Sequence, residues 1–215
     1  MKEKDSEKTY INDLIKHQED SIAFFSNSMK PERERSVCAA FLRCLGVGFS
    51  ANEVVAEKDD PPDVIFRQAN FEINELYEVG RKRHDEYRER YKELKKAKTI
   101  NDTLIPIEWP NPISYSFLFA DIESALCEKA KKYGLKNCSF LDALVYVSLP
   151  HKFLDKKSEI PSTNKIKEQG WRSVSFVIPP YSHVVYCKES APEFLIRFEG
   201  KTYWEWKDLD GLFAI

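Results

Sequence analysis

Two acidic residues stand next to a turn on short β-type runs, and they are the side chains best placed to do chemistry in this chain. A double proline predicts a turn that delivers Asp63 to the start of the apolar run 64–66. The next run, 70–77, alternates by twos, which places Glu72 on a strand. If the two runs pair as a hairpin, both carboxylates reach one place. That arrangement outlines a site for a hard divalent cation.

Alternation along the second run assigns its side chains to two faces of a strand. We expect Phe71, Ile73 and Glu75 on one face, and Glu72, Asn74 and Leu76 on the other. A plain structural alternative stays open, because the prolyl turn is ordinary and Glu72 and Asn74 would also suit the solvated face of a two-sided sheet.

The spacing Pro62-Asp63, eight residues, then Glu72-Ile73-Asn74 resembles the PD-(D/E)XK nuclease motif. The resemblance implies a Mg²⁺ or Mn²⁺ ion held by Asp63, Glu72 and the carbonyl of Ile73. Such an ion lowers the pKa of a water that attacks a phosphodiester.

The third motif position departs from the pattern. It is usually Lys, which holds the attacking water and stabilises the developing negative charge. Here it is Asn74, which can orient a water but carries no charge. Lys82 or Arg81, from the segment after the strand, is the expected replacement for the missing cation.

A wider resemblance is carried by six segments of the chain: 32–35, 41–46, 60–64, 71–73, 80–87 and 170–175. Together they resemble a small bacterial family of unknown function that is described as endonucleases with a restriction-endonuclease-like fold. The resemblance covers most of the chain after about residue 30. Because a fold hosts many activities, it implies a nuclease without fixing the reaction.

Glu34 is a candidate third carboxylate. Pro31 suits the first turn of a helix, and Glu34 lies at the edge of the apolar stripe that contains Val37 and Phe41. An acid that faces inward needs a partner. The first helix of this nuclease fold often supplies a metal ligand, which makes Glu34 an auxiliary ligand. In the alternative reading it pairs with a nearby arginine.

A basic cluster, Arg81, Lys82 and Arg83, opens a helix predicted over 81–98. The cluster directly follows the candidate metal strand, so it could contact phosphates of a nucleic acid. The structural alternative is a solvated helix face with i,i+4 ion pairs.

Length and composition limit the possible domain organisation, binding partners and compartment of the protein. The 215 residues predict one domain, 30–215, with a helical extension over 1–29. The net charge of −2 disfavours nucleic-acid binding by the molecule as a whole, so a local basic face would have to provide it. Five cysteines without metal-site spacing indicate reduced core thiols. With no apolar leader or membrane-length run, we expect a cytoplasmic protein that makes no membrane contact.

The remaining periodicity predicts an α/β fold, bordering on α+β, with a mixed central sheet of about five strands flanked by helices. A helix over 115–133 leads to a strand over 141–148, which implies a parallel crossover. Segments 171–178 and 183–187 predict a hairpin, and 191–198 a short helix. Aromatic residues near the C-terminus are expected in the core or under a partner.

Three functions follow from these patterns. The leading hypothesis is a Mg²⁺-dependent nuclease acting on DNA, with Asp63, Glu72, Asn74 and Lys82 as catalytic residues. The second is a catalytically silent protein of the same fold that binds nucleic acid or a protein partner. The third is a helical interaction protein that forms homodimers.

Overall fold

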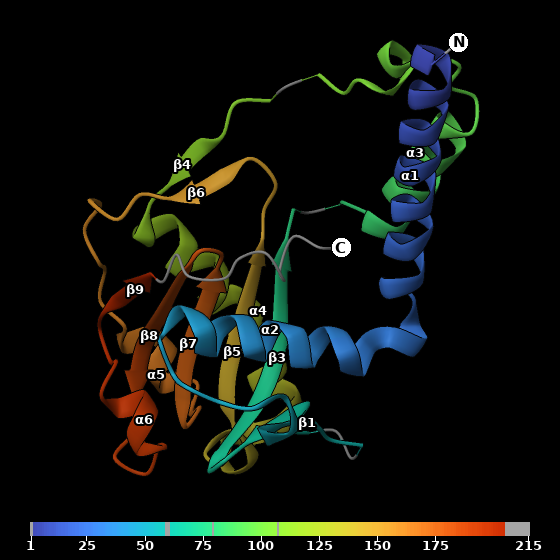
Figure 1. Ribbon diagram of the computed structural model, residues 1–215. Coiled ribbons are helices and arrows are strands. Elements are labelled where there is room, and N and C mark those ends of the chain that lie inside the picture. The colour runs from blue at the N-terminus through green and yellow to red at the C-terminus, as the bar shows by residue number, and fades with distance from the viewer. Residues whose placement is uncertain (1, 59–60, 79, 107, 205–215) are drawn as a thin grey trace.

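The computed structural model describes residues 2–58, 61–78, 80–106 and 108–204. Its centre is a seven-stranded mixed sheet with strand order β1-β2-β3-β5-β7-β8-β9 (Figure 1). The strands are β1 Val54–Ala56, β2 Val64–Phe66, β3 Ala69–Tyr77, β5 Asp142–Ser148, β7 Ser173–Ile178, β8 Tyr181–Cys187 and β9 Thr202–Trp204. This confirms the predicted α/β class, with two more strands than expected.

The helices are α1 Lys2–Phe24, α2 Lys30–Cys44, α3 Arg83–Leu94, α4 Tyr115–Cys138, α5 Asn164–Glu168 and α6 Glu193–Ile196. Short 3₁₀ turns occur at Asn27–Met29, Ala51–Glu53 and Ile100–Thr103. A separate two-stranded parallel sheet pairs β4 Asn111–Ile113 with β6 Lys152–Leu154. None of the helices within the described ranges is long and apolar enough to span a membrane.

The predicted hairpin forms, and the predicted crossover is parallel. β2 pairs antiparallel with β3, and β3 pairs parallel with β5 along its length from Phe71 to Tyr77. α4 provides the connection between β3 and β5 and covers one face of the sheet, whereas α2 crosses the opposite face (Figure 1). The sheet therefore separates an α2 face from an α4 face.

Alternation along the strands divides the core into two clusters. On the α2 face Phe41 packs against Phe71 and near Leu144. On the α4 face the core contains Leu126, Ala143 and other apolar residues of α4, β5 and β7. The predicted assignment of the β3 side chains to two faces is confirmed where they join these clusters, with Phe71 and Ile73 on the α2 face and Leu76 on the α4 face.

Two local expectations differ from the structure. The helix predicted over 115–133 is longer, because α4 continues to Cys138 across a kink at Gly134, whose φ of 75° is accessible to glycine. No strand was predicted before residue 64, yet β1 at Val54–Ala56 pairs with β2. A three-residue strand has too few alternating positions to show a period in sequence.

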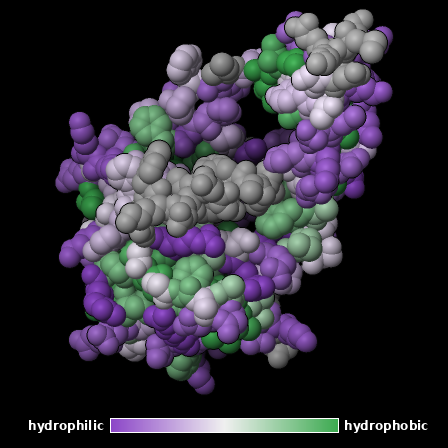
Figure 2. Space-filling view, in the orientation of Figure 1, coloured by the Kyte–Doolittle hydropathy of each residue, from purple (hydrophilic) through white to green (hydrophobic). Residues whose placement is uncertain are grey.

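α1 and α3 form a two-helix arm that extends from the sheet domain (Figure 1). Phe25 stacks on Tyr87 at its base, with ring centroids 5.0 Å apart, and Gln18 donates to the carbonyl of Tyr87. The extension predicted over 1–29 thus packs mainly on α3. The arm is mostly hydrophilic in Figure 2.

All five cysteines are free, as expected of reduced thiols. Cys38, Cys44 and Cys138 are buried in the core, where burial raises the pKa of the Cys38 and Cys138 thiols. The predicted core aromatics Trp206 and Phe213 lie outside the described residues.

Phe41 tests the α2-face core. It is fully buried and makes an edge contact with Phe71, so Phe41→Ala should lower the free energy of unfolding by about 3–5 kcal/mol. Phe140, which is 61% exposed, supplies the control, and Phe140→Ala should change stability by less than about 0.5 kcal/mol. Urea denaturation followed by circular dichroism measures both, and equal losses would contradict the assigned core.

Candidate functional site

Asp63 is held at the start of β2 with its carboxylate turned onto β3. Its backbone N–H donates to the carbonyl of Phe71, which extends the ladder of the hairpin by one residue. Its side-chain Oδ2 accepts the N–H of Ile73 at 2.8 Å. Asp63 is only 5% exposed, so this hydrogen bond and a nearby cation compensate the burial of its charge.

The cation is Lys30, at the start of α2. Its Nζ lies 3.1 Å from Oδ1 of Asp63 and 3.1 Å from Oε1 of Glu34, one helical turn further on. The side chain of Glu34 is also hydrogen-bonded to that of Asp63. We call these two carboxyl groups, bridged by Lys30, the Glu34–Asp63 pair.

The pair has unusual protonation. Burial and the negative charge of Asp63 raise the pKa of Glu34 to about 7, even though Lys30 acts in the opposite direction. For Lys30, partial burial acts to lower the pKa, but the two carboxylates outweigh it and raise the pKa. Near neutral pH the Glu34 carboxyl is therefore partly protonated while Lys30 stays charged beside it, and a bound cation could take the place of that proton.

Glu72 lies on the opposite face of the sheet from this pair. Its Oε1 accepts hydrogen bonds from Nζ of Lys129 at 2.5 Å and from the hydroxyl of Tyr133 at 2.9 Å, both on α4. Its Oε2 is buried with no partner among the described residues. Burial raises the pKa of Glu72, and the ammonium of Lys129 partly opposes this.

The carbonyl of Ile73, a predicted metal ligand, also faces a side chain of α4. It accepts a hydrogen bond from Nζ of Lys129 at 2.8 Å. Lys129 thus binds both Glu72 and the backbone that follows it, which ties α4 to β3.

The predicted site residues are therefore brought together only in part. Asp63 and Glu34 meet, whereas Glu72 is turned toward α4 by the alternation of β3. Within the described ranges, no three His, Cys, Asp or Glu side chains are grouped so that they could hold a metal ion. Among the described residues, the α2 face thus brings two of the predicted carboxylates, Glu34 and Asp63, next to one another.

A cavity of about 430 Å³ opens beside the pair on the α2 face. Lys30 and Glu34 form part of its wall, Arg33 and Arg83 add positive charge, and Asn74 borders it. The side chain of Asn74 makes no hydrogen bond with any residue that the structure describes. Aromatic groups from α1, β3 and β5 complete the lining.

The predicted basic cluster is mostly engaged in ion pairs. Arg81 binds Glu86, with its Nη2 2.8 Å from Oε2. Arg83 contacts Glu75 and the hydroxyl of Ser148, and its guanidinium lies 4.7 Å from the ring centre of Phe25. Lys82 is exposed and makes no ion pair within the described ranges, so it is the member of the cluster with a free charge.

Sequence reasoning missed the lysines of both faces. Lys30 was not predicted as a site residue, although it lies four residues before Glu34, which is the spacing of a helical ion pair. Lys129 and Tyr133 show the same i,i+4 spacing on α4, but nothing in the sequence says that this turn of the helix passes over Glu72. That contact requires the crossover geometry.

Nearly the whole chain, and with it this site, matches a known protein family. Residues 6–208 match a family described as "Putative endonuclease, protein of unknown function (DUF1780)", and the chain belongs to that family. No curated protein matches the chain.

One solved structure is also similar to this chain. It is a protein of unknown function from Pseudomonas aeruginosa strain PAO1, described as belonging to the monooxygenase superfamily. The two chains are 28% identical, the match covers 92% of this chain and 94% of the other, and the TM-score is 0.66.

The raised pKa of Glu34 makes stability depend on pH. The folded protein binds this proton more tightly than the unfolded chain, so the stabilising contribution is present below the usual glutamate pKa and is lost as pH rises toward about 7. Glu34→Gln should remove this decline, which we expect to be about 1–2 kcal/mol after solvent screening. Urea denaturation from about pH 4.5 to 7.5 measures it.

Glu32→Gln is the matched control, because Glu32 lies on the same helix but is exposed and pairs with Arg35. This variant should keep the decline of the parent protein. A Glu34→Gln curve with the same slope as the parent would contradict the assignment.

The contact between Lys129 and Glu72 gives a second test. Lys129→Met leaves Glu72 buried without its cation and should cost about 2–4 kcal/mol near neutral pH. Adding Glu72→Gln to that variant removes the orphaned charge and should recover part of the loss. A double-mutant cycle by chemical denaturation measures the coupling, and strictly additive losses would argue against the contact.

Proposed function

We propose that this protein is a divalent-metal-dependent nuclease that hydrolyses DNA phosphodiester bonds at the Glu34–Asp63 pair. The observation that supports it most directly is the meeting of a buried and a partly buried carboxyl group with one ammonium at the edge of a cavity. The family description is consistent with it. The proposal differs from the sequence-based expectation in leaving Glu72 out of the metal site.

The residues present fit a Mg²⁺ or Mn²⁺ ion. Mg²⁺ is commonly held by one or two carboxylates and keeps several waters, so Glu34 and Asp63 suffice without a third protein ligand. The proton that Glu34 partly holds near neutral pH is what such an ion would replace. When bound, it would polarise a phosphoryl oxygen and lower the pKa of a coordinated water.

Lys30 takes the role that Asn74 cannot fill. Its ammonium lies next to both carboxylates, where it would stabilise the developing negative charge on the phosphoryl oxygens. Asn74 also borders the cavity, but the alternation of β3 turns its side chain toward the α4 face with those of Glu72 and Leu76, so we assign it no part in holding the water. In the hydrolysis the attacking water would lose a proton to solvent as its oxygen bonds to phosphorus, the bond from phosphorus to the leaving oxygen would break, and that oxygen would take a proton from solvent.

Contact with the rest of the nucleic acid would come from the unpaired charge of Lys82, with Arg81 and Arg83 beside it. These residues lie at the start of α3, and Arg83 also borders the cavity. Because the whole chain carries a net charge of −2, this local positive surface is the electrostatic footprint that the proposal requires.

A catalytically silent binder of nucleic acid is the second candidate. The observation in its favour is that Glu72, the acidic residue of the nuclease-like motif, is already bound by Lys129 and Tyr133, and that the position of the motif lysine is Asn74. Such a protein would retain the α2-face cavity and its cations without turnover.

Purified protein with supercoiled plasmid and Mg²⁺ or Mn²⁺ tests the proposal. The parent protein should nick the plasmid, and Glu34→Gln and Asp63→Asn should each lower the rate by at least about 100-fold because each removes a metal ligand. Lys30→Met should lower it by roughly 10- to 100-fold. Glu32→Gln, on the same helix, should leave the rate unchanged.

The remaining outcomes separate the candidates. Nicking that survives both Glu34→Gln and Asp63→Asn would overturn the proposed site. Binding of DNA without cleavage, weakened by salt and by Lys82→Ala, would favour the silent binder. Absence of both nicking and binding would reject both functions.

A further inference from the structure

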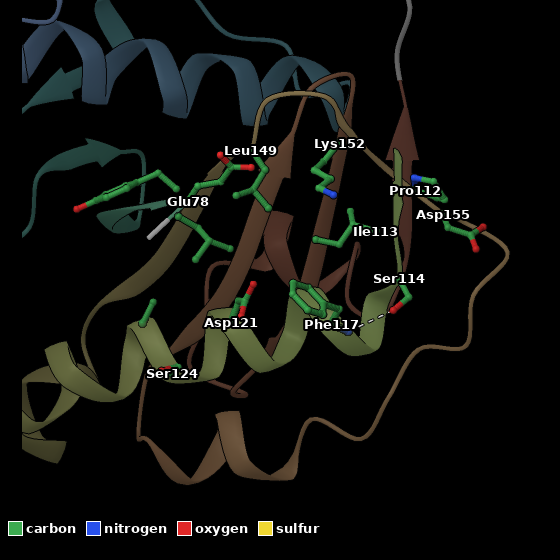
Figure 3. Close-up of a pocket in the computed structure, with 13 residues that line it drawn as sticks. Glu78, Pro112, Ile113, Ser114, Phe117, Asp121, Ser124, Leu149, Lys152 and Asp155 are labelled. Atoms are coloured by element: carbon green, nitrogen blue, oxygen red, sulfur yellow. Dashed lines mark hydrogen bonds between the residues drawn. The ribbon is translucent and has the colours of Figure 1, made fainter. Parts of the chain in front are cut away.

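A second and larger cavity lies on the α4 face of the sheet, away from the Glu34–Asp63 pair. Its volume is about 770 Å³, within the range of small-molecule sites in proteins. It is lined by the ends of β3 and β5, the first turns of α4 and the small β4–β6 sheet (Figure 3). The proposed nuclease function does not use this space.

The floor and sides of this α4-face cavity are mainly apolar. Leu76 lines it, Ile113 and Leu149 point into it, and Phe117 stands at its edge with 61% of its surface exposed (Figure 3). An apolar surface of this kind, with a few polar groups at defined places, is the usual form of a ligand site.

Asp121 is the polar group that singles out a ligand class. It projects from α4 toward the cavity beside Phe117 (Figure 3), and its carboxylate makes no hydrogen bond or ion pair within the described ranges. Partial burial raises its pKa, as expected for a carboxylate with no compensating partner. A donor that arrives with a ligand would satisfy it.

The other charges around the cavity favour a cation as that donor. Glu78 and Asp155 add two further carboxylates, against a single ammonium from Lys152. Within the described ranges Lys152, which also lines the cavity, forms no ion pair, so it does not neutralise Asp121. The lining therefore has an excess of negative charge next to an apolar floor.

We propose that the α4-face cavity binds a small amphiphilic amine, with its ammonium group on Asp121 and its apolar body against Leu76, Ile113 and Leu149. The N–H donors of an ammonium make charge-assisted hydrogen bonds to a carboxylate, and in an apolar setting these are stronger than neutral ones. This inference stands whether or not the protein is a nuclease.

Matched pairs of ligands test the ammonium contact directly. Phenethylamine, tryptamine and phenylbutylamine are each compared with the corresponding alcohol by saturation-transfer NMR and titration calorimetry. At least one amine should bind roughly tenfold or more tightly than its alcohol. Asp121→Asn should abolish that preference and leave the affinity for the alcohol unchanged.

Two further variants keep the test decisive. Glu128→Gln is the matched control, because Glu128 lies on the same helix with its side chain 83% exposed, and it should preserve the preference for amines. Ala125→Phe fills the cavity and should abolish binding of both ligand classes. Thermal unfolding checks that each variant is folded.

Three results would overturn the inference. They are equal affinity for the amine and the alcohol in every pair, a preference for amines that survives Asp121→Asn, and failure of every amine to bind at millimolar concentration. Loss of plasmid nicking in the other experiments has no bearing on these results, because the residues concerned lie on the other face.

Discussion

The alternation of side chains along β3 is the constraint on which the rest of the structure depends. Consecutive side chains of a strand point to opposite faces, so Glu72 enters the α4 side, whereas Asp63 accepts the N–H of Ile73 at the edge of β3 and meets Lys30 of α2. Each acid then meets its own lysine, Lys30 or Lys129. Two separate ion pairs, each between a buried carboxylate and a partly exposed lysine, replace the single cluster of acids that spacing alone suggested.

Much of the fold could be predicted because its elements have clear periods. The hairpin of β2 and β3, the α4 crossover and the C-terminal hairpin all carry two- or 3.6-residue patterns long enough to read. β1, β4, β6 and β9 were missed, and each has three residues. Too short to show a period, they are determined by neighbouring strands rather than by their own sequence.

The candidate site was less predictable for a physical reason. The approach of Asp63 to Glu34 follows from the position of α2 above the hairpin, and the edge position of Glu34 on its apolar stripe was a usable signal. The contact of Glu72 with Lys129 joins residues 57 positions apart. Sequence spacing fixed which face of β3 carries Glu72, but not which helix covers that face.

The arm formed by α1 and α3 has a mechanical consequence. α1 leads within a few residues to Lys30, and β3 leads to Arg83 at the start of α3, so both roots of the arm lie at the wall of the α2-face cavity. At 1.5 Å per residue, α1 is about 35 Å long. A force on the tip of the arm would therefore act through a long lever on the segments that carry Lys30 and Arg83.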